Sequence, residues 1–232
     1  MNGLLLLDKP IFYTSHDIVD VVRRKLQIRR VGHAGTLDPM ATGLLVIMIG
    51  QATSLFAKLS GHDKEYEGLL TLGIETDTHD LEGKIVKTHD ASATSPELIE
   101  RAFRNLLGEQ TQEIPRYSSA KVGGRKSYAM ARKNVAFETQ TKQVDIKALE
   151  IQAIDMPNVY FRADVSKGTY IRALCAQIGR DLGTVACLSA LRRTRSGQFR
   201  LSDGLTIEQL RAMPVAQIQS RLIQMEPETA VR

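Results

Sequence analysis

Residues 32–43 of this 232-residue chain read GHAGTLDPMATG, and the next six residues, Leu44–Ile49, read LLVIMI. Three glycines and a proline in the first segment predict a loop whose backbone can come close to a ligand. The apolar run that follows is typical of a buried strand. Together they predict a loop that presents Asp38 at the end of a sheet. Composition alone favours a plainer alternative, in which Asp38-Pro39 only begins a turn and His33 caps a helix.

The segments on either side predict further strands and helices. Leu4–Leu7 is a second buried strand, and the capping-box pattern Thr14-x-x-Asp17 opens a helix after it. Another helix is expected from about residue 52 to residue 59. A third begins at the N-cap Ser95 and ends before Gly108. Its predicted apolar stripe consists of Leu98, Ala102, Phe103, Leu106 and Leu107.

The remaining stretches predict an antiparallel sheet. Segments with partial alternation of apolar and polar residues lie at 66–72, 84–88, 144–154 and 159–166. Short turns at Glu82-Gly83 and Pro157-Asn158 join neighbouring segments into hairpins. We therefore expect an α+β fold, with a mixed, mostly antiparallel sheet flanked by helices and loops, in one continuous domain.

Composition places the chain among ordinary globular proteins. Hydrophobic residues make up 43% of it, and its longest apolar runs are far shorter than the roughly 20 residues that cross a bilayer. The N-terminus carries no charged leader before a long apolar stretch, so we expect a soluble protein that is not exported. Cys175 and Cys187 have the spacing of neither a zinc site nor a disulfide framework, which favours a reducing cytoplasm.

Positive charge gathers in three stretches, although the formal net charge is only +5. The first is residues 23–30. The second lies between 114 and 137, which contains no Asp or Glu, and the third runs from 165 to 200 with Asp181 as its single acid. One such stretch is often a solvated helix face, but three of them favour a shared surface for a polyanion.

Missing motifs exclude several chemistries. The chain has no GxxxxGK(S/T), GxGxxG, HExxH or GxSxG pattern. Its five histidines are scattered without metal-ligand spacing. We therefore expect neither a metal nor a nucleotide cofactor.

Five motifs in order resemble those of the TruB family of tRNA pseudouridine synthases, over about residues 4–200. The segment GHAGTLDPMATG resembles the catalytic motif of that family. The other matching segments are Asp8-Lys9-Pro10 with Thr14-Ser15, Lys64-Glu65-Tyr66-Glu67 with Thr76-Asp77-Thr78-His79-Asp80, Ser119-Ala120-Lys121 with Ala131-Arg132, and Ser166-Lys167-Gly168-Thr169-Tyr170-Ile171-Arg172 with Leu191-Arg192-Arg193-Thr194.

The resemblance implies the pseudouridine synthase fold and an enzyme that isomerises the uridine at position 55 in the T-loop of tRNA. It implies that Asp38 is the catalytic carboxylate and that Arg172 pairs with it, since a permanent cation keeps a secluded carboxylate ionised. It also places Tyr66 against a uracil that has been flipped out of the stack, where this residue helps to remove the C5 proton.

Three more residues would shape the pocket on the same grounds. Tyr170 and Leu191 would form the walls of the base pocket, and His33 would fill the space that the uridine leaves.

Isomerisation needs no group donor and no redox step, so the resemblance implies no cofactor. The expected partner is the T stem-loop of tRNA, with no metal, membrane or protein partner required. Weaker candidates for phosphate contacts are Lys9, Lys121, Arg125, Lys126, Arg132, Lys167, Arg192 and Arg193.

The chain also departs from the family pattern. Phe12 stands where the N-terminal motif usually has Gly, and Ile114 stands where the first of two prolines is usual. Too few residues follow Leu201 for the additional C-terminal RNA-binding domain of the PUA type that bacterial relatives often carry. We therefore expect a catalytic domain at 1–200 and a short extension at 201–232, with one helix at Thr206–Met213.

The residues leave some alternatives open. A protein on the same scaffold could bind or fold RNA without catalysis, or could modify a different RNA. The resemblance does not decide whether Asp38 attacks as a nucleophile or abstracts a proton from the sugar. The role of the cluster from Arg23 to Arg30 and the oligomeric state also stay open.

Overall fold

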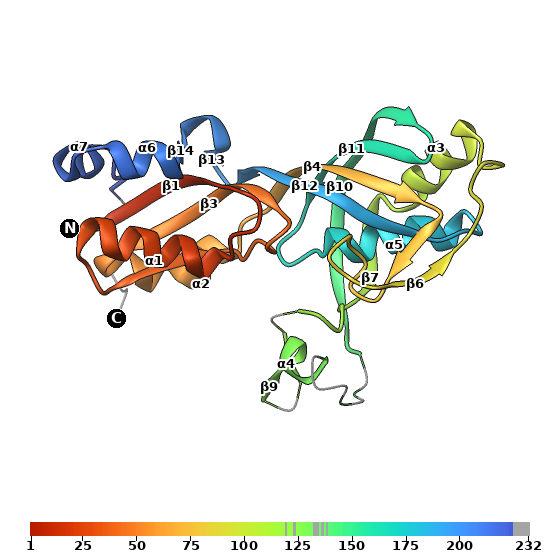
Figure 1. Ribbon diagram of the computed structural model, residues 1–232, viewed down its shortest axis with the longest axis horizontal. Helices are drawn as coiled ribbons and strands as arrows, with labels where there is room; N and C mark the ends of the chain where they lie inside the picture. Colours follow the sequence, from red (N-terminus) through yellow and green to blue (C-terminus); the bar gives the residue numbers. More distant parts are fainter. Residues whose placement is uncertain (119, 123, 132–134, 136, 138, 225–232) are drawn as a thin grey trace. The chain divides into compact units, whose positions relative to one another are not determined.

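The computed structural model describes residues 1–118, 120–122, 124–131, 135, 137 and 139–224, and Figure 1 shows its elements. The described chain divides into two compact units. Unit 1 joins Met1–Tyr66 to the chain from Arg192 onward, and unit 2 is Glu67–Leu191. The boundaries between them fall inside two strands, β4 (Lys64–Leu72) and β12 (Ala186–Ser196).

Unit 1 is built on a short mixed sheet. Its central strands β1 (Gly3–Lys9) and β3 (Thr42–Ile49) are antiparallel, and β2 (Val31–Ala34) is antiparallel to β3. The C-terminal half of β12 runs parallel to β3, and β14 (Leu205–Thr206) runs parallel to β1. The strand β13 (Phe199–Arg200) turns back along β12.

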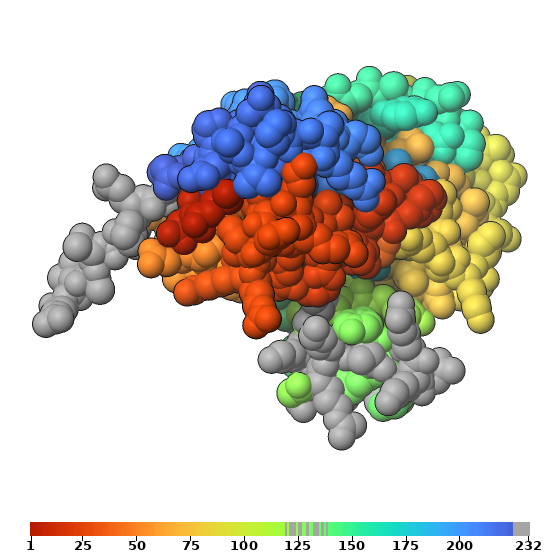
Figure 2. All heavy atoms as spheres, turned by 60° about the vertical axis from the view of Figure 1, so that its left-hand side comes forward, coloured from red at the N-terminus to blue at the C-terminus, as the bar shows by residue number. Residues whose placement is uncertain are grey.

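Helices cover both faces of this sheet, which explains why β1 and β3 are continuously apolar. One face packs against α1 (Ser15–Leu26), α6 (Ile207–Ala212) and α7 (Val215–Ser220), which bury Ile18, Leu210 and Ile218. Figure 2 shows the blue spheres of α6 and α7 against the red and orange spheres of the N-terminal residues. The other face packs against η1 (Gly50–Leu55) and α2 (Phe56–Ser60) through Ala52 and Leu59.

Unit 2 contains strands in the order β4, β11, β10 and β7. The long strand β10 (Thr141–Asp155) pairs antiparallel with both β11 (Asn158–Val165) and β7 (Gly108–Glu113). The helices α3 (Pro96–Asn105) and α5 (Ile171–Asp181) belong to this unit. Phe103 of α3 meets Phe161 of β11 edge to face, with ring centroids 6.1 Å apart. A Cβ at Gly68 would lie 2.3 Å from the Phe161 ring, so this position in β4 requires glycine.

Three small elements complete unit 2. The hairpin of β5 (Ile74–Thr76) and β6 (Ile85–Thr88) follows β4. The ribbon of β8 (Lys121–Val122) and β9 (Arg125–Lys126) leads into α4 (Ser127–Ala131). In the described part of the chain, no helix is long and apolar enough to cross a membrane.

Most predicted elements are confirmed. The strands around Leu4–Leu7 and Leu44–Ile49 are present, the hairpin at Pro157-Asn158 joins β10 to β11, and Thr14 forms the capping box of α1 with Asp17. Ser95 caps α3 through a hydrogen bond from the N–H of Leu98.

Other predictions were wrong in detail. The segment from about 52 to 59 begins as a 3₁₀ helix, and Leu98 and Leu107 are exposed while Ile99 is buried in their place. The C-terminal region holds two short helices rather than one. Neither α5 nor β12 was predicted. The predicted loop at 32–43 begins only after Ala34, because Val31–Ala34 pairs with β3.

Candidate active site

A buried arginine fixes both ends of the loop that carries Asp38. Arg193 is only 1% exposed, and its Nε donates to the carbonyl of Leu44 at 2.7 Å while its Nη2 donates to the carbonyl of Gly35 at 3.0 Å. Its backbone also pairs with Gly43, where an added Cβ would lie 2.4 Å from the Arg193 carbonyl oxygen. Gly43 has a φ of +99°, so both space and conformation require glycine there.

A buried serine holds the middle of the same loop. The Oγ of Ser15 donates to the Leu37 carbonyl at 3.1 Å and accepts from the Leu37 N–H at 2.9 Å. One hydroxyl thus satisfies both backbone groups of the residue before Asp38. The carbonyl of Asp38 accepts from the N–H of Ala41 at 3.1 Å. Asp38-Pro39 therefore does begin a turn, but His33 lies in β2 and caps no helix.

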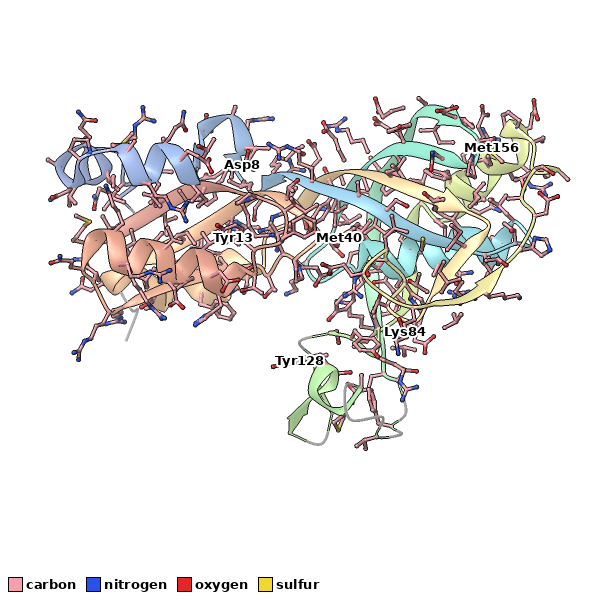
Figure 3. The ribbon with its side chains drawn as sticks, in the orientation of Figure 1. Asp8, Tyr13, Met40, Lys84, Tyr128 and Met156 are labelled. Atoms are coloured by element: carbon pink, nitrogen blue, oxygen red, sulfur yellow. The ribbon has the colours of Figure 1, made fainter. Side chains whose placement is uncertain are left out.

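Lys9 supports the residue after Asp38. Its side chain is completely buried, and Nζ donates to the carbonyls of Pro10, Tyr13 and Pro39 at 3.0, 2.6 and 3.2 Å. Hydrogen bonds to three carbonyls offset the free-energy cost of removing the ammonium group from water. The N–H of Phe12 donates to the same Pro39 carbonyl at 2.9 Å. Asp8, Tyr13 and Met40, which belong to the two segments joined here, are labelled in Figure 3.

These contacts correct two sequence-based predictions. Lys9 and Arg193 were expected to bind RNA phosphates, but both are buried and bind backbone carbonyls inside unit 1. Arg192 differs from them. It is partly exposed and pairs with Asp8 through its Nη2 and the Asp8 Oδ2 at 2.6 Å.

The neighbouring His33 is neutral near pH 7. Burial, together with the smaller effect of the positive charges of Arg193 and His16, lowers its pKa to about 4. Its Nδ1 is buried without a hydrogen-bond partner among the described residues. An uncharged ring suits the role that the sequence predicts for His33, which is to fill the space of a base.

Tyr66 lies on β4 and is 7% exposed. The adjacent Glu65 accepts a hydrogen bond from the Thr194 hydroxyl at 2.7 Å and lies 3.8 Å from the Arg195 Nε, measured from its Oε2. These contacts fix the start of β4 against the end of β12 within unit 1.

In unit 2, Arg172 is 4% exposed and lies in the first turn of α5. Its Nε lies 3.4 Å from the Oδ2 of Asp80, its Nη1 donates to the Thr78 carbonyl at 2.7 Å, and its Nη2 donates to the Tyr117 carbonyl at 2.9 Å. The predicted pairing of Arg172 with Asp38 would join residues of different units and stays a prediction.

Asp80, to which the sequence analysis gave no role, is the buried carboxylate that faces Arg172. It is 3% exposed, and its Oδ1 accepts hydrogen bonds from the Thr78 hydroxyl at 2.6 Å and from the Glu82 N–H at 3.0 Å. The signal was the run Thr76-Asp77-Thr78-His79-Asp80, in which a threonine two residues before an aspartate can bond to it. This run was assigned to a motif without a role for Asp80.

A second missed residue, Gln112, holds Tyr170. Its Oε1 accepts from the Tyr170 N–H at 2.8 Å, and its Nε2 donates to the Tyr170 carbonyl at 3.1 Å. Lys142 lies over the Tyr170 ring, with Nζ 4.9 Å from the ring centroid. Burial lowers the pKa of Lys142. The remaining pocket candidate, Leu191, is 9% exposed and lies in β12 at the end of unit 2.

The other predicted phosphate contacts lie in unit 2. Lys167 is exposed in the loop before α5. Lys121 lies in β8 and Arg125 and Lys126 lie in β9, whereas Arg132 is outside the described residues. A pocket of about 740 Å³ in the same unit is lined by β7, β10, α5 and the turn at His79, and none of the predicted site residues that the structure describes lines it.

Part of the basic cluster at 23–30 serves unit 1 itself. Arg23 pairs with Asp20 and donates to the Val31 carbonyl, and Lys25 donates to the Arg211 carbonyl. The cluster therefore ties the end of α1 to its neighbours. Among the described residues, no group of three or more His, Cys, Asp or Glu side chains is arranged to hold a metal ion.

Comparison with known families agrees with this geometry. A model described as TruB family pseudouridylate synthase (N terminal domain) matches residues 23–171, and one described as tRNA pseudouridylate synthase B C-terminal domain matches residues 172–225. The chain belongs to the TruB family of pseudouridylate synthases. It is therefore an isomerase, as the motifs predicted. The predicted domain boundary at residue 200 stays a prediction.

Individual TruB relatives cover nearly the whole chain. The tRNA pseudouridine synthase B of Opitutus terrae is 42% identical over 96% of this chain and 92% of its own length. The enzyme of the same name from Alkaliphilus oremlandii is 46% identical over 92% of this chain and 71% of its own length.

Solved structures confirm the predicted pseudouridine synthase fold. The archaeal box H/ACA sRNP Nop10-Cbf5 complex aligns over 90% of this chain with a TM-score of 0.66 and 30% identity. A Cbf5-Nop10-Gar1 complex aligns over 89% of it with a TM-score of 0.70 and 30% identity. This chain spans about half the length of each matched chain, at 52% in both cases.

Proposed function

We propose that this protein isomerises the uridine at position 55 in the T-loop of tRNA, with Asp38 as the catalytic carboxylate. The observation that carries the proposal is the loop of Asp38, which is held on both sides by buried groups: Ser15 on Leu37, Lys9 on Pro39, and Arg193 on Gly35 and Leu44. Such fixation is what a catalytic group needs in order to meet its substrate in one geometry. Relatives named tRNA pseudouridine synthase B support tRNA as the substrate.

The reaction exchanges two bonds of one nucleotide. The bond from C1′ of the ribose to N1 of the uracil breaks, the base turns, and C1′ bonds to C5. N1 gains a proton and C5 loses one, so the reaction is balanced without an oxidant, a reductant or a group donor. Asp38 acts on the ribose or the base, either as a nucleophile or as a base toward a sugar proton. It must be ionised in both cases, and Arg172 would favour the charged form by pairing with it.

The remaining site residues bind and orient the base. Tyr66 lies against the uracil and helps to take the C5 proton, and Tyr170 and Leu191 form the walls. His33 fills the space left by the flipped uridine, which its lowered pKa of about 4 supports because a neutral ring can replace a stacked base.

The RNA is bound through its phosphates by cations of the two later basic stretches, namely Lys121, Arg125, Lys126, Arg132, Lys167 and Arg192. A stem-loop is recognised mainly by shape, which requires contacts along the backbone rather than a code of base edges. No metal and no protein partner is required in this scheme.

The test is release of label from tRNA that carries tritium at uridine C5. Wild type should release tritium without added metal or nucleotide, and Asp38→Asn should reduce the rate by at least about a thousandfold while tRNA binding is retained. The matched control is Asp17→Asn, which changes an exposed carboxylate of unit 1 in the α1 capping box. Unchanged turnover in Asp38→Asn would contradict the assignment.

Mapping of the modified nucleotide completes the test. Incubation with unmodified tRNA should place pseudouridine at position 55 of the T-loop and nowhere else. Modification at another position would mean that the enzyme acts on a different RNA site. Binding without any isomerisation would favour a protein that only binds or folds RNA.

A further inference from the structure

The turn after β1 contains an aromatic residue in an unusual backbone conformation. Phe12 has a φ of 67°, in the left-handed region where glycine is the usual residue. The sequence departs from the family pattern at this same position, since Gly is usual there. Strained positions of this kind concentrate at functional sites, so the presence of a bulky residue here indicates a role for its side chain.

Packing in the core is not that role. Phe12 is 77% exposed, the largest exposed fraction among the exposed large hydrophobic residues that the structure describes. The preceding Ile11 is 47% exposed. The ring therefore gains little from burial and offers most of its surface to the solvent.

Its position is tied to the loop of Asp38. The N–H of Phe12 donates to the carbonyl of Pro39, the residue after Asp38, at 2.9 Å. The buried Lys9 binds the same carbonyl at 3.2 Å. All of these residues belong to unit 1. The aromatic ring is thus carried on a turn that is bonded directly beside the catalytic residue.

We propose that Phe12 is a stacking platform for a nucleobase of the substrate RNA, next to the nucleotide that is held at Asp38. This inference rests on the proposed function. When a uridine leaves the stack, its neighbours lose a stacking partner and expose their faces. Aromatic side chains bind such faces without regard to base identity, and exposed aromatics are a common means of binding unpaired RNA.

The first experiment compares binding of T stem-loop RNA to Phe12→Gly, Phe12→Tyr and wild type. The Kd should rise about five- to hundredfold in Phe12→Gly, which is the effect of losing one stacked base, and stay near the wild-type value in Phe12→Tyr. Because glycine accepts a positive φ without strain, the melting temperature of Phe12→Gly should be equal to or above that of wild type. Weaker binding then cannot be attributed to unfolding.

The matched control is Phe56→Ala. Phe56 is also an exposed phenylalanine of unit 1, with 53% exposure, but it begins α2, and none of the hydrogen bonds described above joins it to the loop of Asp38. Its removal should leave the Kd unchanged. The slope of log Kd against log salt should be the same in Phe12→Gly and wild type, because stacking releases no counterions.

A spectroscopic experiment observes the stack directly. The chain contains no tryptophan, so Phe12→Trp and Phe56→Trp each introduce a single indole. Addition of the RNA should quench the fluorescence of Phe12→Trp and leave that of Phe56→Trp unchanged. The loss of binding in Phe12→Gly and the quenching in Phe12→Trp should both occur at the same RNA concentrations.

Several results would overturn the inference. One is an unchanged Kd in Phe12→Gly while wild type releases tritium from tRNA. That result would leave the proposed function intact. Another is a change of oligomeric state in Phe12→Gly at constant Kd, which would assign the ring to contact between copies of the chain. Absence of tritium release by wild type would contradict the proposed function instead, and the binding titration would still measure whether Phe12 stacks on RNA.

Discussion

The two units hold their candidate catalytic segments in different ways. In unit 1, the cations of Lys9 and Arg193 are buried and donate to backbone carbonyls on either side of Asp38. In unit 2, the buried cation of Arg172 faces a buried carboxylate, Asp80, as well as two carbonyls. The contacts in unit 1 hold the conformation of a loop, while those in unit 2 hold a charged side chain in place. Substitutions in the two units should therefore fail differently.

The largest effect should follow from Arg193→Met, which removes the link between the two ends of the Asp38 loop. Two hydrogen bonds from a charged donor to buried carbonyls are lost, and we expect the free energy of unfolding to fall by about 4 kcal/mol. The kcat/KM for tRNA should fall by at least about a hundredfold, since Asp38 loses its position. Urea denaturation and tritium release measure the two quantities.

The neighbouring Arg192→Met is the control for this change. Arg192 is 41% exposed in its side chain and pairs with Asp8 near the surface, so its removal should cost less than about 1 kcal/mol. Equal destabilisation by both substitutions would mean that burial of Arg193 does not matter for the loop.

A smaller effect is expected from Asp80→Asn in unit 2. The amide keeps the shape of the carboxylate but removes the negative charge that faces Arg172, and we expect a loss of about 2 kcal/mol in the free energy of unfolding. Asp77→Asn is the matched control, because Asp77 lies in the same turn and is exposed. If Asp80→Asn were as stable as wild type, the negative charge of Asp80 would not be needed to hold Arg172.

Ser15→Ala tests the middle of the Asp38 loop without removing a charge. It leaves the buried N–H and carbonyl of Leu37 without their partner, which should cost about 1.5 kcal/mol. The kcat/KM should fall about tenfold with little change in KM, because the loop still forms but is less fixed. Ser54→Ala removes an exposed hydroxyl that bonds to the Gln51 carbonyl, and it should change neither the free energy of unfolding nor kcat/KM.

The smallest effect concerns pH. The folded-state pKa of His33 is about 4 and its ordinary value is 6.5, so between these values the unfolded chain binds more protons and stability falls as pH falls. We expect His33 to contribute a loss of about 1 kcal/mol between pH 7 and pH 5.5. Denaturation at several pH values measures this loss.

The variant His33→Gln should show a shallower dependence by that amount. Some dependence should remain, since the pKa of His62 in unit 1 and that of His79 in unit 2 are lowered as well, mainly by burial. Identical pH profiles of wild type and His33→Gln would mean that His33 is not the group that titrates.

Local patterns predicted much of both units correctly. The apolar runs of β1 and β3, the caps Thr14 and Ser95 and the turn at Pro157-Asn158 are short-range features, and the structure confirms each of them. The sequence did not predict strand β12, because its arginines are charged and a charged segment does not indicate a buried strand. Arg193 can lie in a strand at a buried position only because Gly35 and Leu44, about 150 residues earlier, offer it carbonyls.

The sequence by itself determined the family, the α+β class and the position of Asp38 between two glycines that permit a tight loop, because these depend on residue identity and near neighbours. Only the tertiary structure decided the roles of the cations. Lys9 and Arg193 look the same as Lys167 and Arg192 in a count of charges, yet the first two are buried and hold the backbone. Whether a cation meets carbonyls or solvent depends on contacts between distant segments, and composition carries no information about these.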